Sequence, residues 1–159
     1  MAFRVLDSSA FYAGIPFSSN EPSYITSLVY NEIEHIKKDH DAVQILIETK
    51  RLMISDPEHR FIITANNAAK KSGDFPNLSD EDISTIALSL QLKAELVTDD
   101  FAISNVAKNL SIKVIPVMTS GIKNVIIWKY YCPGCKTDFS KVTECPRCGN
   151  RLKRKPMKN

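Results

Sequence analysis

The chain has only four cysteines, and their spacing constrains its fold more than any other feature. They form two Cys-x-x-Cys pairs, Cys132/Cys135 and Cys145/Cys148. Two intervening residues let both sulfurs of a pair point at one ion, and two such turns supply the tetrahedron of thiolates that zinc prefers. A segment of about 30 residues cannot bury a useful hydrophobic core, so metal ligation would provide most of its folding free energy. The spacing therefore predicts a structural zinc ribbon with all four cysteines as ligands.

Two other uses of the cysteines are disfavoured by their surroundings. The alternatives are two disulfides in a small secreted module and a redox-active pair of the thioredoxin type. The N-terminus has neither a basic segment nor an apolar signal segment, which argues against secretion. No strand–helix–strand pattern surrounds either pair. Since no histidine or further ligand lies nearby, the site is expected to be closed rather than catalytic.

The charge of the chain is divided between two parts. Residues 1–128 hold 12 Lys+Arg against 16 Asp+Glu, a formal charge of −4, whereas residues 129–159 hold 9 against 2, a charge of +7. Aromatic residues lie among the C-terminal cations, and this combination suits phosphate contact and base stacking. The alternative is that the aromatic residues only pack the ribbon and the basic end is solvated. The predicted RNA-contacting residues are Lys129, Lys136, Arg147, Arg151, Lys153, Arg154 and Lys155.

The acidic part alternates between strand and helix patterns. We expect strands at 3–6, 61–64, 96–98 and 112–117, and helices along the apolar stripes at 28–36, 43–54, 65–71, 79–90 and 101–110. This alternation favours a parallel sheet covered by helices on both faces. No apolar run approaches the ~20 residues that cross a bilayer, so no membrane association is expected.

Acidic residues follow the predicted strands at the edge where parallel sheets bind ligands. Asp7 follows the first strand, and Asp99 and Asp100 follow the strand at 96–98. Glu32 lies on an otherwise apolar helix face, and Asp82 lies in the first turn of a helix. Carboxylates gathered together cannot all stay ionised without cations, so they would recruit Mg²⁺ or Mn²⁺. Such ions activate a water for attack on a phosphodiester.

Each of these acids also has a purely structural explanation. Asp82 could complete a capping box with Ser79, and Asp7 and Asp100 could cap the helices that follow them. Glu32 could lie on a solvated helix face. The sequence leaves these alternatives open.

Four segments resemble the motifs of PIN-domain ribonucleases: residues 5–11, 29–33, 78–83 and 96–101. A PIN domain followed by a four-cysteine ribbon is similar to the archaeal form of the NIN-one-binding protein family, the endonuclease that trims the 3′ end of small-subunit ribosomal RNA (rRNA). The resemblance implies an α/β fold in which a PIN-like parallel sheet flanked by helices is followed by a small zinc ribbon. The implied boundaries are a nuclease domain at 1–117, a linker at 118–127, the ribbon at 128–152 and a basic tail at 153–159.

The resemblance also implies residue roles. Asp7, Glu32 and Asp82 match the acids of the family, and Asp100 matches the fourth, although the adjacent Asp99 could share or take its role. Two hydroxyl residues match positions that orient an acid or a water, namely Ser9 and Thr98.

The function that follows is a cytoplasmic, metal-dependent endoribonuclease that acts on precursor small-subunit rRNA in a pre-ribosomal particle. Its cofactors would be structural Zn²⁺ and catalytic Mg²⁺ or Mn²⁺. The alternatives are a toxin-type PIN ribonuclease that cuts other RNA and a non-catalytic assembly factor that binds rRNA.

Overall fold

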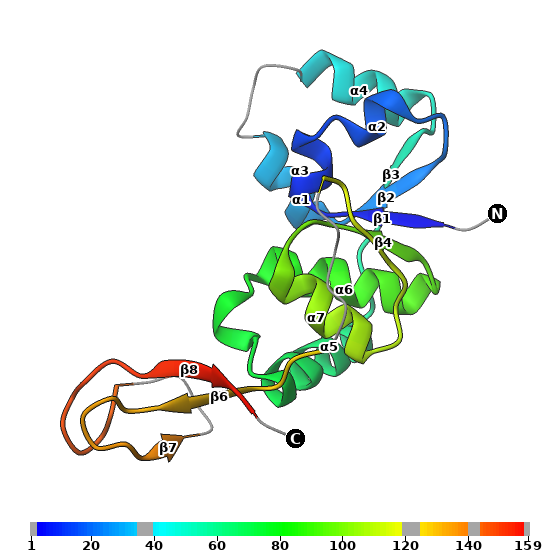
Figure 1. The fold of residues 1–159 in the computed structure, drawn as a ribbon. Helices are drawn as coiled ribbons and strands as arrows, with labels where there is room; N and C mark the ends of the chain where they lie inside the picture. Colours follow the sequence, from blue (N-terminus) through cyan, green and yellow to red (C-terminus); the bar gives the residue numbers. More distant parts are fainter. Residues whose placement is uncertain (1–2, 35–39, 119–124, 140–143, 158–159) are drawn as a thin grey trace.

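The computed structural model describes residues 3–34, 40–118, 125–139 and 144–157, which form an α/β body and a small antiparallel sheet (Figure 1). The body contains a five-stranded parallel sheet in the order β3-β2-β1-β4-β5. The strands are β1 (Arg4–Leu6), β2 (Ser23–Ile25), β3 (Leu52–Ile54), β4 (Glu95–Val97) and β5 (Val114–Ile115). The expected parallel sheet flanked by helices is confirmed.

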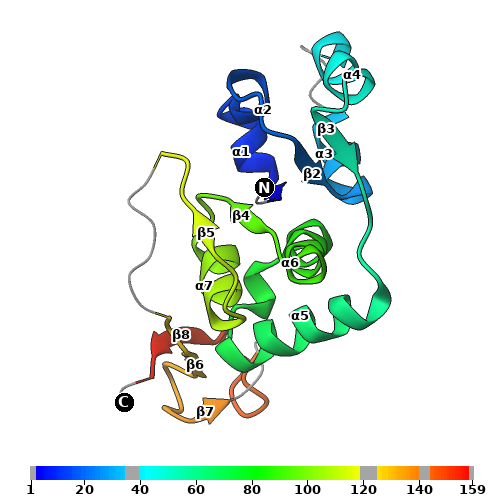
Figure 2. The ribbon, with the colours of Figure 1, turned by 90° about the vertical axis from the view of Figure 1, so that its right-hand side faces the viewer.

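Helices cover both faces of this sheet. Those on one side are α1 (Ser8–Tyr12), α2 (Ile15–Ser18), α3 (Ser27–Glu34) and α4 (His40–Glu48). Those on the other side are α5 (His59–Ser72), α6 (Asp80–Leu92) and α7 (Phe101–Asn109), with a short 3-10 helix, η2 (Phe75–Asn77), between α5 and α6. Figures 1 and 2 show the two groups on opposite sides of the strands.

Alternation along the strands explains these two layers. Successive side chains of a strand point to opposite faces. Val5 and Leu96 accordingly lie in the core cluster formed with α5, α6 and α7, whereas Leu6 and Val97 lie in the cluster formed with α1, α3 and α4. All four side chains are at most 3% exposed, so the two central strands are buried on both faces.

Two of the predicted elements are wrong, and two strands, β2 and β3, were not predicted. Residues 61–64 form part of α5 rather than a strand, because Phe61, Ala65 and Ala68 share the helix face that packs on the core. The stripe at 43–54 is not one helix: α4 ends at Glu48, Lys50 has a positive φ of 57°, and β3 follows. β2, the other strand that was not predicted, is only three residues long.

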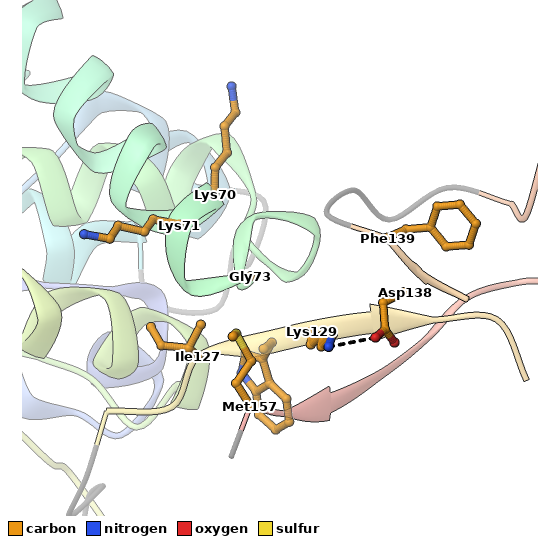
Figure 3. Close-up of a pocket in the computed structure, with 9 residues that line it drawn as sticks. Lys70, Lys71, Gly73, Ile127, Lys129, Asp138, Phe139 and Met157 are labelled. Atoms are coloured by element: carbon orange, nitrogen blue, oxygen red, sulfur yellow. Dashed lines mark ion pairs between the residues drawn. The ribbon is translucent and has the colours of Figure 1, made fainter. Parts of the chain in front are cut away.

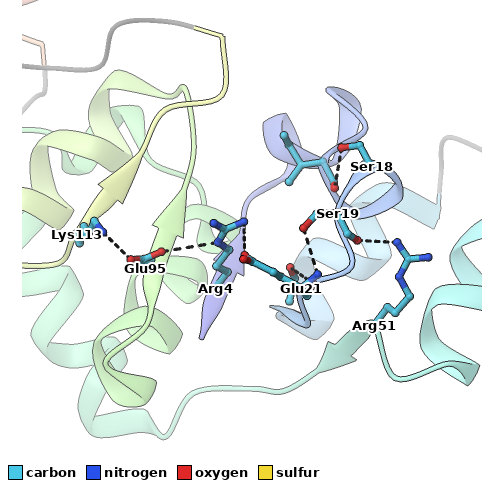
Figure 4. Close-up of polar contacts among 9 residues, drawn as sticks. Arg4, Ser18, Ser19, Glu21, Arg51, Glu95 and Lys113 are labelled. Atoms are coloured by element: carbon cyan, nitrogen blue, oxygen red, sulfur yellow. Dashed lines mark hydrogen bonds and ion pairs between the residues drawn. The ribbon is translucent and has the colours of Figure 1, made fainter. Parts of the chain in front are cut away.

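Ion pairs join the strands at the amino end of the sheet (Figure 4). Arg4 of β1 contacts Glu21, with an N–O distance of 2.6 Å, and Glu95 of β4 at 3.7 Å. Lys113, just before β5, reaches Glu95 at 2.8 Å. Partly exposed pairs of this kind contribute only about 0–1 kcal/mol each. These pairs connect the amino ends of the strands, whereas Asp7, Asp99 and Asp100 follow the carboxyl ends.

The C-terminal unit is a three-stranded antiparallel sheet in the order β7-β6-β8. Its strands are β6 (Trp128–Tyr131), β7 (Asp138–Phe139) and β8 (Lys153–Pro156). Its small core consists of Tyr130, Cys132, Cys145 and Leu152. β8 brings residues 153–156 of the predicted basic tail into the sheet. None of the helices described is long and apolar enough to cross a membrane.

Candidate active site and metal centre

The pairing of β1 with β4 brings Asp7 beside Thr98. Leu6 lies opposite Val97 in the parallel register, so the next residue of each strand emerges at the same edge. The buried Asp7 carboxylate accepts a short hydrogen bond from the Thr98 hydroxyl. It also accepts from the Ser9 hydroxyl at 2.7 Å and from the Ala10 N–H at 3.0 Å. The two predicted supporting hydroxyls therefore hold Asp7 in one orientation.

Asp82 and Asp100 both cap helices. Asp82 accepts from the Ser79 N–H at 2.9 Å and its own N–H donates to the Ser79 hydroxyl at 3.2 Å, which completes the capping box of α6. Asp100 accepts from the Ile103 N–H at 2.9 Å at the start of α7. Each cap occupies one carboxylate oxygen, and the second oxygen can still accept. Capping and cation binding are thus compatible at these positions.

Glu32 is brought to this edge by α3. A buried hydrogen bond of 2.8 Å joins the hydroxyls of Thr26, at the start of α3, and Ser84 of α6. Thr26 also accepts from the Val29 N–H at 3.2 Å, within the first turn of α3. This hydrogen bond holds α3 against α6. Glu32 is then near enough to Asp82 and Asp7 for their charges to act on it.

The four acids repel one another. Burial raises the pKa of Asp7, against hydrogen bonds from Thr98, Ser9 and Ala10 that lower it, and the Asp100 charge raises it further. Burial also raises the pKa of Asp82, and the charges of Asp100 and Asp7 add to the shift. The pKa of Glu32 is raised by partial burial and by Glu81, Asp82 and Asp7. A bound cation would relieve this repulsion, so the oxygen donors fit a hard divalent ion.

The carboxylates are spread more widely than the ligands of a formed metal site. Within the described ranges, a group whose ligand atoms all lie within 4.8 Å of one another is found only at the cysteines. The acids therefore form an open cluster that a cation would draw together.

Asp99 has different surroundings from Asp100. Its two oxygens accept from the Val117 N–H at 2.7 Å and the Met118 N–H at 2.8 Å. Both bonds fasten the segment that follows β5. This arrangement gives Asp99 a structural use, whereas Asp100 is the neighbour that raises the pKa values of Asp7 and Asp82.

Sequence reasoning missed two residues near Glu32. Glu81, in the first turn of α6, adds to the negative charge around Glu32. Tyr12 has its pKa raised by burial and then by the Glu32 charge. Glu81 lies inside a motif already singled out, but Tyr12 comes to the site only through the packing of α1 against α3.

The four cysteines form the predicted cluster. All four are free, so the disulfide alternative is wrong. The sulfurs of Cys132 and Cys148 lie 3.3 Å apart and those of Cys135 and Cys145 lie 3.9 Å apart. The Cys135 N–H lowers the pKa of Cys132 to about 6, while hydrogen bonding with Cys148 and the other thiols raises the pKa of Cys135 to about 12. Hydrogen bonding within the cluster therefore favours a single ionised thiol. Four thiolates at this spacing would need a bound cation to offset their repulsion.

Comparison with known proteins covers both units. Residues 5–92 match the family described as the PIN domain of ribonuclease. The chain is 33% identical over 157 residues to endoribonuclease Nob1 of Pyrococcus abyssi, which covers 97% of this chain and 94% of that protein. It is 37% identical over 163 residues to endoribonuclease Nob1 of Methanocaldococcus jannaschii, covering 100% and 80%. The chain belongs to the Nob1 endoribonuclease family.

This assignment confirms the resemblance to a PIN domain joined to a ribbon, and the expected nuclease class. PIN nucleases depend on a divalent metal, in agreement with the repulsion among the acids. Ribonuclease VapC1 of Thermoplasma acidophilum is also similar, at 36% identity over 123 residues, but covers 77% of this chain and 63% of that protein. The Nob1 relatives match more of the chain than this ribonuclease does.

The cysteine cluster predicts tightly held zinc. Elemental analysis of the purified protein should find about one zinc per chain, because four thiolates form a closed tetrahedral site. Removing the metal with a chelator should unfold the ribbon, since ligation supplies most of its folding free energy. Intact mass without metal and four hydrogens below the reduced value would contradict this, because it would show two disulfides.

Asp82→Asn should abolish divalent-dependent cleavage without destabilising the metal-free protein. Asparagine keeps the acceptor for the Ser79 N–H and removes the repelled charge. Because the folded-state pKa of Asp82 is raised, its ionised form costs stability at neutral pH, and this cost disappears as the pH falls through that pKa. The variant should melt at or above wild type at pH 7, with the difference shrinking in acid.

The control for Asp82 is Asp80→Asn, which removes an exposed charge from the same helical turn. It should cut RNA at the wild-type rate. An Asp82→Asn protein that still cuts normally would show that Asp82 is a helix cap only.

Proposed function

We propose that this protein is the metal-dependent endonuclease that matures the 3′ end of small-subunit rRNA within a pre-ribosomal particle. The observation that supports the proposal most directly is how much of the chain aligns with the Nob1 relatives. It spans nearly the whole chain, and hence both the acidic nuclease body and the basic four-cysteine ribbon. A substrate that engages both units must be long enough to extend from one to the other. The free thiols suit a reducing compartment such as the cytoplasm.

In this proposal Asp7, Glu32, Asp82 and Asp100 hold Mg²⁺ or Mn²⁺. A divalent ion held there supplies an activated water and stabilises charge on the attacked phosphodiester. Hydrogen bonds from Thr98 and Ser9 hold the Asp7 carboxylate in one orientation, so the direction in which it can bind an ion is fixed. The helix caps fix one oxygen of Asp82 and one of Asp100. The side chains are therefore oriented before the ion or the RNA arrives, which lowers the cost of reorganisation.

The predicted RNA-contacting cations divide into two sets. Lys129 and Lys155 contact Asp138, with N–O distances of 2.7 and 3.7 Å, and the Arg154 guanidinium lies 4.1 Å from the centre of the Trp128 ring. These three have partners within the ribbon. The exposed remainder, and so the preferred phosphate contacts, are Lys136, Arg147, Arg151 and Lys153.

A groove between α5 and the ribbon is lined by further lysines, which belong to the acidic part of the chain and were not among the predicted RNA contacts. It has a volume of about 380 Å³ and is lined from the body by Lys70, Lys71 and Gly73 (Figure 3). From the ribbon it is lined by Trp128, Lys129 and Phe139, among others. Cations beside aromatic rings suit single-stranded RNA. We include the groove in the proposed RNA path.

A non-catalytic assembly factor would have no use for carboxylates whose mutual repulsion destabilises the folded chain. A toxin-type ribonuclease is disfavoured by the C-terminal unit, since the VapC1 likeness covers less of the chain than the Nob1 likeness.

The function is tested by mapping cleavage on a precursor rRNA fragment that spans the 3′ end of the small-subunit sequence. With Mn²⁺, cuts should concentrate at the mature end and leave a 3′-hydroxyl. Asp7→Asn should abolish them, because Asp7 is the most deeply buried acid of the cluster. Cuts scattered along the fragment, or preferred cleavage of transfer RNA, would support the toxin-type alternative.

The ribbon cations are tested by Arg147→Ala combined with Arg151→Ala. Loss of two phosphate contacts should weaken RNA binding and reduce the slope of log K against log salt by about 1.4 for single-stranded RNA. The control is Arg60→Ala combined with Lys113→Ala, which removes the same charge from exposed positions on the body. An equal effect of both pairs would mean that only total charge matters.

A further inference from the structure

A buried polar link joins the nuclease body to the segment that enters the ribbon. Asp74 follows the C-terminal end of α5 and Asn105 lies on α7; neither side chain is exposed. The Asp74 carboxylate accepts from the Ser72 hydroxyl at 2.7 Å and from the Asn105 amide nitrogen at 2.6 Å. The link thus ties α5 to α7 directly beneath the ribbon.

Asn105 also binds both backbone groups of Ile126, two residues before β6. Its amide nitrogen donates to the Ile126 carbonyl at 2.6 Å, and its carbonyl oxygen accepts from the Ile126 N–H at 2.7 Å. One primary amide therefore uses both of its hydrogens and its oxygen, to Asp74 on one side and Ile126 on the other. A carboxylate or an apolar side chain of similar size lacks this combination of donors and acceptor.

Further contacts seat β6 on the same part of the body. The Tyr130 hydroxyl donates a short hydrogen bond to the Gly73 carbonyl. The Trp128 ring packs edge to face on Phe101, with centroids 6.5 Å apart. Gly73 has a positive φ of 82°, and a Cβ there would lie 2.7 Å from the Trp128 carbonyl oxygen. The strand and the glycine are in direct contact.

The buried polar groups around Asp74 contribute more to a defined geometry than to the free energy of folding. Burial raises the pKa of Asp74, while hydrogen bonds from Ser72 and Asn105 and the charge of Arg154 oppose the shift. The Trp128 indole nitrogen also favours the charged carboxylate, yet that nitrogen and one Asp74 oxygen are buried without a full hydrogen bond in the described part of the chain. Buried polar groups of this kind contribute little net stability, and their geometry is highly specific.

The link also adjoins the segments that carry the acids. Asp74 begins the stretch through η2 that leads to Asp82, and Phe101, which contacts Trp128, directly follows Asp100. Two short segments of chain therefore connect the seat of the ribbon to Asp82 and Asp100.

We propose that Asn105 is a positioning residue that determines where the RNA is cut, by holding the ribbon in one orientation relative to the acids. RNA held by the ribbon then presents one phosphodiester to the cluster. This inference rests on the proposed function, because it requires a substrate that engages both units. Loss of the link frees the ribbon to rotate, and neighbouring phosphodiesters reach the acids, while the chemistry at the acids is unchanged.

The test uses the full chain with Asn105→Ala and two RNAs in Mn²⁺. One is the precursor rRNA fragment, and the other is an oligonucleotide too short to reach the ribbon. The variant should cut the short RNA at the wild-type rate. On the precursor the rate at the main position should fall by about 10- to 100-fold, since misplacement by 1 Å can cost about 100-fold, and cuts at adjacent nucleotides should appear. The matched control is Asn109→Ala, the same change at an exposed position on the same helix.

A second variant separates positioning from support of the body. Tyr130→Phe removes the donor to Gly73 from the ribbon side, so it leaves the body's own contacts intact, and it should broaden the cut distribution in the same direction. Backbone ¹⁵N relaxation should show the ribbon and body tumbling together in wild type, and the ribbon moving faster in both variants.

Two results would overturn the inference. One is an unchanged cut position in both variants. The other is an equal loss on both RNAs for Asn105→Ala with no effect of Tyr130→Phe, which would mean that Asn105 only supports the body. A wild-type protein that cuts the precursor at scattered positions would refute the proposed function itself; the relaxation data would still report whether Asn105 fixes the ribbon.

Discussion

The parallel pairing of β1 with β4 is the constraint on which the site depends. Because Leu6 lies opposite Val97, Asp7 and Thr98 leave the sheet side by side, and Asp7 and Asp100 are the N-caps of the helices that follow. A shift of one residue in this register would exchange the two faces of the strand and remove Leu6 or Val5 from its core cluster. The packing of the hydrophobic core and the placement of the acids are therefore one requirement.

Both units bring together side chains that would repel one another when ionised, carboxylates in the body and thiols in the ribbon. In the body, carboxylates from four separate segments gather at one edge of the sheet, and burial together with neighbouring negative charge raises the pKa values of Asp7, Glu32 and Asp82. In the ribbon, four thiols from two turns are close enough to share protons. Oxygen donors in an open cluster suit an exchangeable hard ion, and sulfur donors in a closed cluster suit a permanent one. The two clusters thus differ in donor chemistry and in how closely their ligand atoms are gathered.

The sequence was sufficient for features that depend on local spacing. The cysteine pairs, the capping box at Ser79 and Asp82, and the acids after the strands at 3–6 and 96–98 are all of this kind. It failed at 61–64, where β-branched residues suggest a strand but packing on α6 favours a helix, and at β2, which is too short to show a period. The link between Asp74 and Asn105 could not be predicted, because its residues are 31 positions apart and no periodicity relates them.

The contact at Gly73 limits how this chain can vary. A side chain there would need both a backbone conformation that L-residues rarely adopt and space that the Cβ and carbonyl group of Trp128 already fill. Substitution of the Trp128 ring would not relieve the contact, since the opposing atoms are the Cβ, carbonyl carbon and carbonyl oxygen of Trp128. Both obstacles therefore act against any other residue at position 73 while the ribbon is seated, whereas only the positive φ at the end of α5 would remain without it. The contact with the ribbon thus adds a second requirement for glycine to the one that the helix end already imposes.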